Sequence, residues 1–367
     1  MMNLRAKATA MNEYPHKDPM QYGRRHALQL LSALSLLPQQ SFALAQSPVG
    51  SETETLIRLN LPGPGSLPFL PLELISSLGF DREIGARLVL RYHPSGIRAL
   101  EDVLGGNADF AALGFPTLPV LMAKGKDAVA IAPISGEQQV FHLMVRKDLA
   151  KKITRIKDLA GHTIGTSTGS PSSKTYMQMM AEIVLQAHGV GPQQVRWLPT
   201  GQNWESASGA FISQAADALF CEQPFPNRLL REGLGVTLLD LSDKRTHAGL
   251  AGVNALRSVV ATARMLLGQP DGQRKADLMV RMMQRTLVWL RAATPQAVAK
   301  QANMRSRQEQ LDITDLLTKT PLIYSADARF NMRQVQDTDV FLRATQSDTV
   351  LGPATNHIDS RWSGQRA

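Results

Sequence analysis

The sequence predicts an α/β protein of two similar lobes with mostly parallel sheets, joined by two crossover strands. From Leu56 onward, short apolar strands alternate with helical patterns, which is the order typical of βαβ units. The alternation runs through once and begins again after the charged run 147–152. Residues 106–112 and 214–220 both place Ala-Asp between a helix end and a strand of small residues, with coincidence as the alternative explanation. A chain of 367 residues can hold two such lobes.

The first lobe, residues 46–140, is predicted from four apolar strands separated by three helical segments. The strands are short, and the segments between them repeat apolar residues at helical spacing. Connections of this kind join parallel strands, so ligands are expected beyond the carboxyl ends of the strands. The predicted strands are 56–60, 87–92, 110–113 and 128–133, and the predicted helices are 67–78, 96–104 and 118–124.

The second lobe, residues 141–254, repeats this order. The apolar strand 140–146 comes before the repeated units, and we interpret this strand as the crossover between the lobes. The second set consists of strands 163–166, 195–198, 217–220 and 236–239 and helices 172–188, 205–214 and 226–231.

Residues 255–345 are expected to return to the first lobe. Strand 256–261 serves as the second crossover, and the amphipathic helices 272–293 and 295–319 are periodic enough to pack against a sheet. The remaining residues, 346–367, are predicted to form a frayed tail.

Residues 1–45 resemble a twin-arginine export signal. The arginine pair 24–25 precedes the apolar segment 27–37, and the segment ending at Ala45 fits the small-x-small rule for cleavage. The apolar segment is too short to span a bilayer, so a buried N-terminal helix is the alternative. Cys221 is the only cysteine, which excludes an internal disulfide and a lipidated cysteine at the cleavage site. We expect a freely diffusing periplasmic protein, cleaved after Ala45.

The composition is that of a globular protein, because 43% of the residues are hydrophobic and 19% are charged. The net charge is +9, but the Lys and Arg residues are scattered and lack the interleaved aromatic residues of a nucleic-acid surface. The histidines lack the spacing of zinc ligands, and the segment 63–68 lacks the third glycine of a dinucleotide-binding motif. We expect no nucleic-acid partner, no metal and no cofactor.

The segment 155–173 reads as a helix start, a strand, a Gly/Ser-rich turn and a new helix. Backbone amides at a helix N-terminus lack intrahelical acceptors and bind anions. Ser170 is expected to be the N-cap and Pro171 the first helical residue. The predicted oxyanion site therefore comprises Ser167, Thr168, Gly169, Ser170 and Ser172.

Two loops after strands of the first lobe are further candidates. The glycines of loop 62–69 allow close approach of the backbone to a ligand, although a bare turn has the same composition. The loop 114–117 offers a hydroxyl and an aromatic side chain, of which Phe115 alone is more typical of a core. The candidate residues are Pro64, Gly65, Ser66, Phe69, Gly114, Phe115 and Thr117.

Glu222 follows a strand of the second lobe and favours a ligand that carries a positive or hydrogen-bond-donating group. A carboxylate opposite an anion site suits a zwitterion such as taurine, or a pyrimidine amine, better than nitrate. A solvated carboxylate or a salt bridge to Arg228 is the alternative. Trp204, in a loop after another strand, is expected to stack on the ligand or to be buried away from it.

Several of these segments together resemble the solute-binding proteins of ABC importers, in the branch for nitrate, sulfonates, taurine and thiamine precursors. The resemblance rests on the segment 157–165, the element 106–110, the residues 216–218 followed by Glu222-Gln223-Pro224, and the helix that bears Trp289. It extends from about residue 56 to about residue 344. It implies a type II periplasmic-binding fold with the ligand in the crevice between the lobes.

The expected function is the capture of a small anionic or zwitterionic solute by closure of the two lobes, with delivery to ABC permease subunits by a monomer. A thiamine-type pyrimidine or an aromatic carboxylate is an alternative ligand, and a sensor domain is an alternative role. A secreted serine esterase is the alternative from another class, because residues 165–169 match G-x-S-x-G with Ser167 as nucleophile. That geometry is doubtful because the predicted helix begins three residues beyond Ser167, so we expect no enzyme.

Overall fold

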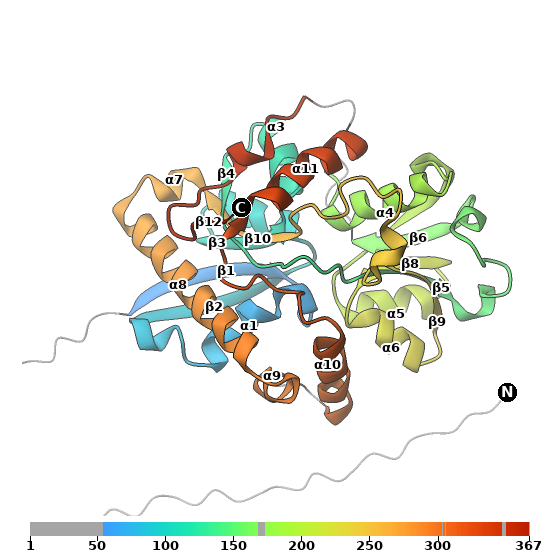
Figure 1. Cartoon of the computed structure of the whole chain (residues 1–367), viewed down its shortest axis with the longest axis horizontal. Helices are drawn as coiled ribbons and strands as arrows, with labels where there is room; N and C mark the ends of the chain where they lie inside the picture. The colour runs from blue at the N-terminus through green and yellow to red at the C-terminus, as the bar shows by residue number, and fades with distance from the viewer. Residues whose placement is uncertain (1–53, 168–172, 303, 305, 347–349, 367) are drawn as a thin grey trace, which may run out of the picture. The chain divides into compact units, whose positions relative to one another are not determined.

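The computed structural model describes residues 54–167, 173–302, 304, 306–346 and 350–366, and it contains two sheets of five strands each (Figure 1). The predicted export signal and its cleavage site lie outside the described residues. Residues 52–367 form one compact unit. The α/β class with two lobes is confirmed.

The sheet of lobe 1 has the strand order β2-β1-β3-β10-β4. β1 pairs in parallel with both β2 and β3, whereas β10 runs antiparallel to β3 and β4. Every residue of β4 and β10 is buried, as expected for strands covered on both faces. The bounds are β1 (Thr55–Pro62), β2 (Ala86–His93), β3 (Phe110–Gly114), β4 (Ala128–Pro133) and β10 (Ser258–Ala263).

The sheet of lobe 2 repeats this arrangement with the order β7-β6-β8-β5-β9. β6 pairs in parallel with β7 and β8, and β5 runs antiparallel to β8 and β9. The antiparallel member of each sheet is thus the strand that enters from the other lobe. The bounds are β5 (Phe141–Arg146), β6 (Thr163–Ser167), β7 (Arg196–Thr200), β8 (Ala218–Glu222) and β9 (Gly235–Asp240).

The two predicted crossover strands are internal members of these sheets. Residues 134–140 carry the chain from β4 to β5, and residues 241–257 carry it back from β9 to β10. The lobes are therefore joined by two segments, the type II arrangement.

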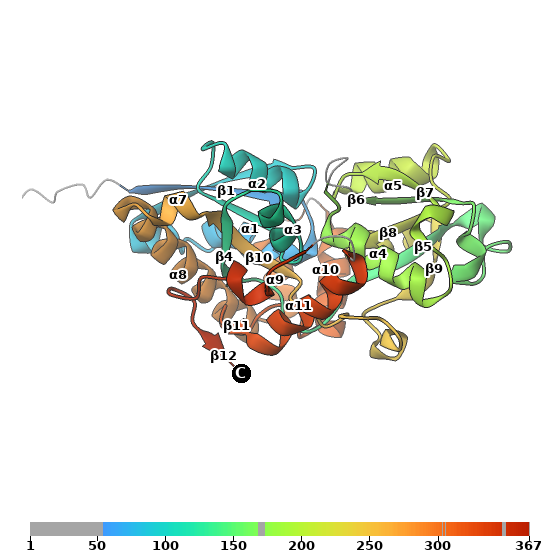
Figure 2. The ribbon, with the colours of Figure 1, turned by 90° about the horizontal axis from the view of Figure 1, so that it is seen from above.

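Helices connect the strands in both lobes. Lobe 1 contains α1 (Leu70–Ser77), α2 (Gly96–Leu104) and α3 (Thr117–Ala123), and lobe 2 contains α4 (Tyr176–Ala187), α5 (Trp204–Ile212) and α6 (Phe225–Arg231). After β10 follow α7 (Arg264–Leu267), α8 (Pro270–Ala292), α9 (Pro295–Gln301), α10 (Arg307–Lys319) and α11 (Met332–Thr345). α8 packs against the sheet of lobe 1, whereas α11 contacts α4 of lobe 2, as Figures 1 and 2 both show.

The predicted Ala-Asp elements occupy equivalent positions in the two lobes. The Asp109 carboxylate accepts the backbone N–H of Arg58 at 2.7 Å, and the Asp217 carboxylate accepts that of Thr163 at 3.0 Å. Asp109 thereby connects the start of β3 to β1, and Asp217 connects the start of β8 to β6.

Three local predictions are wrong. The helix predicted from residue 172 begins at Tyr176, where the Thr175 hydroxyl accepts the N–H of Gln178 as the N-cap, so Ser170 does not cap it. The helix predicted over 295–319 is divided into α9 and α10. The predicted frayed tail packs on lobe 1, because Ile358 forms a bridge with Ala130 and β12 (Gln365–Arg366) pairs with β11 (Phe330–Asn331).

Within the described residues, the structure contains no helix that is both long and apolar enough to cross a membrane.

Candidate functional site

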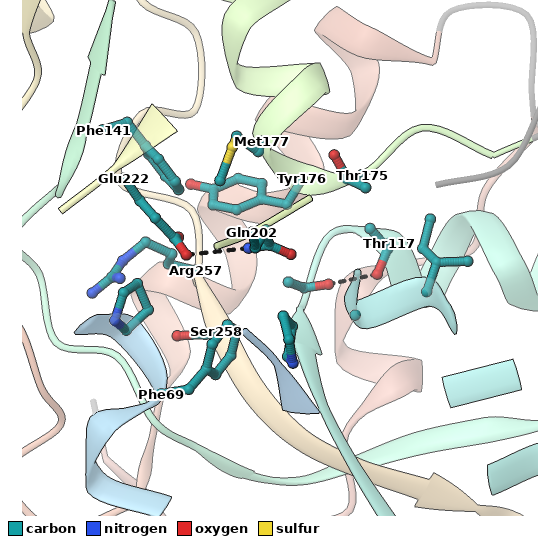
Figure 3. Close-up of a pocket in the computed structure, with 15 residues that line it drawn as sticks. Phe69, Thr117, Phe141, Thr175, Tyr176, Met177, Gln202, Glu222, Arg257 and Ser258 are labelled. Atoms are coloured by element: carbon teal, nitrogen blue, oxygen red, sulfur yellow. Dashed lines mark hydrogen bonds between the residues drawn. The ribbon is translucent and has the colours of Figure 1, made fainter. Parts of the chain in front are cut away.

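A cavity lies where the carboxyl ends of strands from both lobes face each other (Figure 3). β1 ends at Pro62, β3 at Gly114 and β8 at Glu222, and all three residues line the cavity. Its volume of about 40 Å³ has room for a solute of a few heavy atoms, since one water needs roughly 10–15 Å³. Lobe 1 and the crossover before β10 also contribute Phe69, Thr117, Arg257 and Ser258, and lobe 2 contributes Phe141, Thr175, Tyr176, Met177 and Gln202.

Glu222 is buried in this cavity, with 3% of its surface exposed. Its Oε1 atom accepts hydrogen bonds from the Ser66 hydroxyl of lobe 1 and from Gln202 Nε2 at 3.2 Å. Oε2 has no such partner among the described residues. Burial raises the pKa of Glu222 to about 6, although Ser66, Arg257 and Gln202 favour the charged form. The hydrogen bonds to Oε1 therefore hold the carboxylate in place, and Oε2 can accept a hydrogen bond from a ligand.

Arg257 is the second charged group of the cavity, and it is 2% exposed. Its Nη2 donates to the Ile323 carbonyl at 2.8 Å, while Nε and Nη1 are buried and have no hydrogen-bond partner in the described part of the chain. Burial lowers the pKa of this guanidinium, and the nearby Tyr176 and Glu222 oppose the shift. Unpaired buried donors are costly, so these two nitrogens are poised for an anionic or carbonyl acceptor.

Aromatic side chains form walls of the cavity. Phe141 and Tyr176 meet edge to face with their ring centroids 5.6 Å apart. The Tyr176 hydroxyl and the Ser258 hydroxyl are buried without partners among the described residues. Figure 3 shows Tyr176 and Gln202 beside Glu222. The cavity thus combines apolar walls with a few unpaired polar atoms, the usual composition of a small-molecule site.

Gly114 allows the lobes to approach closely at this cavity. A Cβ atom added there would lie 2.4 Å from the Cβ of Tyr176, which belongs to the other lobe. The Thr117 hydroxyl donates to the Gly114 carbonyl at 2.6 Å, so it is bonded within its own lobe. The glycine is therefore required where the two lobes touch.

The structure places the predicted site residues in different surroundings. Phe69, Gly114, Thr117 and Glu222 line the cavity, and Ser66 bonds to Glu222. Pro64, Gly65 and Trp204 line a second cavity instead. Phe115 is fully buried in an apolar cluster of lobe 1, so its interpretation as a core residue is confirmed. Thr168, Gly169, Ser170 and Ser172 lie outside the described residues.

Ser167 ends β6 and is buried, and its hydroxyl has no hydrogen-bond partner in the described ranges. Its carbonyl accepts the Thr175 hydroxyl at 2.5 Å. α4 begins at Tyr176, whereas in a nucleophile elbow the helix follows directly after the serine. A serine esterase also needs an acid that contacts a histidine, and Asp240 and His247 follow Ser167 in that order. Asp240 contacts His142 instead, and His247 contacts the Leu241 carbonyl.

The salt bridge considered between Glu222 and Arg228 does not form. Arg228 contacts Glu232 and Glu309 and lies 4.0 Å from the Trp204 ring centroid. Sequence reasoning missed Arg257, Gln202 and Tyr176. For Arg257 a signal existed, because a charged residue directly precedes β10, a strand of small and apolar residues. Within the described residues, no group of three His, Cys, Asp or Glu side chains could hold a metal ion.

Several solved structures share this fold. A protein from Bordetella bronchiseptica RB50 superposes with a TM-score of 0.73 and 19% identity over 85% of this chain and 96% of that one. The alkanesulfonate-binding protein SsuA from Xanthomonas axonopodis pv. citri, bound to MOPS, gives 0.62 and 16% over 82% and 97%. The periplasmic nitrate-binding protein NrtA from Synechocystis PCC 6803 gives 0.54 and 14% over 71% and 69%. These likenesses show the fold, and the type II prediction is confirmed.

Residues 76–245 match the family model described as NMT1/THI5 like. The match begins within α1 and ends just beyond β9, so it includes Gln202 and Glu222. The resemblance to solute-binding proteins of the nitrate and sulfonate branch is confirmed. The comparison with curated proteins found no match.

Proposed function

We propose that this NMT1/THI5-like chain is the periplasmic solute-binding component of an ABC importer and that its ligand is a small organic zwitterion. The family match and the fold support a solute receptor with permease subunits as partners. The structural neighbours include an alkanesulfonate-binding protein and a periplasmic nitrate-binding protein, which supports a small, polar solute.

The observation that carries the proposal is the pair Glu222 and Arg257. Both are buried in one cavity. Nε and Nη1 of Arg257 have no partner among the described residues, and the hydrogen bonds that Glu222 accepts from these residues go to Oε1 and leave Oε2 available. The two groups are near enough for each to favour the charged form of the other, but no hydrogen bond joins them among the described residues. A zwitterion supplies both missing partners, an ammonium for Glu222 Oε2 and an anionic group for Arg257. A plain anion leaves the buried carboxylate uncompensated.

Closure follows from the position of these residues on both lobes. Glu222 and Gln202 belong to lobe 2, whereas Ser66 and the strand that follows Arg257 belong to lobe 1. A solute that contacts both sides stabilises the closed arrangement relative to an open one. The permease then recognises the closed form.

The test is calorimetric titration with taurine and with ethanesulfonate, a matched solute that lacks the ammonium group. We expect taurine to bind and ethanesulfonate to bind at least tenfold more weakly, because a charge-assisted hydrogen bond contributes about 1.5–3 kcal/mol. Equal affinity for the two solutes would remove Glu222 from the site. Failure of both, with binding of another zwitterion of similar size, would change only the identity of the ligand.

The aromatic walls favour a second candidate, an aminopyrimidine. Its ring would pack against Phe141 and Tyr176, and its amino group would donate to Glu222. A ring needs more space than the described cavity, since benzene occupies a cavity of about 150 Å³. The lobes would therefore close less far around it. Titration with 4-aminopyrimidine tests this candidate, with pyrimidine as the control that lacks the amino group.

A further inference from the structure

A second cavity lies between the lobes, separated from the first by the contact of two loops. The Leu67 N–H of lobe 1 donates to the Gln223 carbonyl of lobe 2 at 3.3 Å, and Ser66 bonds to Glu222 beside it. On its other side, Arg228 and Arg231 of α6 form ion pairs with Glu309 and Asp312 of α10. The cavity between these contacts has a volume of about 220 Å³, larger than the roughly 150 Å³ that accommodate benzene.

The walls of this second cavity are apolar and its charges are mainly negative. The apolar surface comes from α5, α6, α10 and the residues just before α10. The side chains are those of Trp204, Phe225, Met304 and Ile313. Four carboxylates line the cavity, against the single guanidinium of Arg228. Glu309 and Asp312 are paired with the arginines of α6, so the negative excess comes from Glu73 and Glu205.

Glu73 is the more buried of these two acids. Its Oε1 atom is buried and has no hydrogen-bond partner within the described ranges. Burial raises the pKa of Glu73, while the Gly65 backbone and the Tyr92 hydroxyl oppose the shift. The carboxylate of Glu205, which is exposed at the start of α5, takes part in no ion pair among the described residues. Two carboxylates therefore border an apolar cavity without a cation.

We propose that this second cavity binds an organic cation, with a primary ammonium group between Glu73 and Glu205 and an apolar body of about one ring against Trp204 and Phe225. Neither the family match nor the expected importer function assigns a ligand to this place. An ammonium supplies the donors that the two carboxylates lack, and the ring fills apolar surface that is otherwise in contact with water.

The test uses phenethylammonium as the probe and 2-phenylethanol as its uncharged counterpart, titrated calorimetrically into the full chain without any other solute. We expect the ammonium to bind and the alcohol to bind at least tenfold more weakly. Glu73→Gln and Glu205→Gln should each weaken phenethylammonium binding about tenfold or more. Glu232→Gln is the matched control, because Glu232 contacts Arg228 but does not line the cavity, and it should leave the affinity unchanged.

Absence of binding by the wild-type chain would overturn the proposal, as would an affinity that neither Glu73→Gln nor Glu205→Gln changes. Glu205 is exposed, so its variant keeps the test valid if Glu73→Gln fails to fold. Glu222→Gln separates this cavity from the first one. It should weaken the zwitterion binding tested above by about tenfold to hundredfold and leave phenethylammonium binding intact. Weakening of both would place the cation in the first cavity instead.

Discussion

The two lobes have the same strand order but supply different chemistry at equivalent positions. β3 lies between β1 and the antiparallel strand β10, and β8 lies between β6 and the antiparallel strand β5. β3 ends in Gly114 followed by Phe115-Pro116, and β8 ends in Glu222 followed by Gln223-Pro224. Lobe 1 thus has a residue without a side chain where lobe 2 has a carboxylate.

The difference shows that the two lobes contribute different features to the cavity. Gly114 lets Tyr176 of lobe 2 come against the backbone of lobe 1, so lobe 1 provides the space in which the lobes touch. Glu222 provides a charged acceptor, which Ser66 of lobe 1 contacts. Each lobe is therefore incomplete as a site without the other.

The strongest test of this division is Gly114→Ala. The added Cβ would lie 2.4 Å from the Cβ of Tyr176, which is attached to the backbone and cannot rotate away. The lobes must then separate, and we expect solute affinity to fall about hundredfold, equivalent to about 2.7 kcal/mol. Calorimetric titration measures the loss. Gly209→Ala in α5, where a Cβ meets nothing within 4 Å, is the control and should bind normally. An unchanged affinity in Gly114→Ala would mean that closure does not bring these residues together.

Glu222→Gln tests the other half of the comparison. The variant keeps the size of the side chain but loses the charge, so we expect affinity for an ammonium-bearing solute to fall by about tenfold to hundredfold. In the wild type this affinity should rise as the pH increases through about 6, because the carboxylate must ionise. Titrations between pH 5 and 8 measure both effects. A pH dependence that persists in the variant would assign the titration to another group.

The same carboxylate should make the stability of the protein depend on pH. The pKa of Glu222 is about 6 in the folded state and near 4.5 in the unfolded state, so the folded state binds more protons between these values. The free energy of unfolding should therefore fall as the pH rises through this window, by about 2 kcal/mol. Urea unfolding at pH 4 and pH 7 measures the loss, which should be smaller in Glu222→Gln. An equal loss in both proteins would contradict the assignment.

Asp109→Asn and Asp217→Asn test whether the two aspartates stabilise their lobes to the same extent. Each carboxylate accepts a backbone N–H of its own sheet and contacts a cation, Lys275 for Asp109 and Arg146 for Asp217. We expect each variant to lower the free energy of unfolding by about 1–2 kcal/mol without changing solute affinity. Chemical denaturation and titration provide the two readouts. A loss confined to one lobe would show that the elements are alike in sequence only.

The sequence predicts the scaffold better than the site, for physical reasons visible in particular residues. Alternation of strands and helices is a local pattern, so the order of the elements and the duplicated Ala-Asp motif could be read directly. Glu222 was predicted because it follows a strand whose carboxyl end faces the crevice. Arg257 could not be found in this way, since it reaches the cavity from the return crossover, far along the chain.

Other differences arise where local signals compete. Ser170-Pro171 has the composition of a helix start, but the Thr175 hydroxyl caps α4 and leaves Tyr176 at the cavity. Trp204 and Gly65 follow strands as predicted, yet the contact between the two loops places them in the second cavity. Such outcomes depend on how the lobes meet, which spacing along the chain does not encode.

The single cysteine of the chain has a practical consequence. Cys221 lies next to Glu222 at the end of β8, where it is 7% exposed, and burial raises the pKa of its thiol. A buried thiol that stays protonated reacts slowly with alkylating dyes. A cysteine introduced at an exposed position on either lobe can therefore be labelled alone, without replacing the native one. The chain is a ready scaffold for a fluorescent reporter in which a dye at the rim of the cleft reads out the solute concentration.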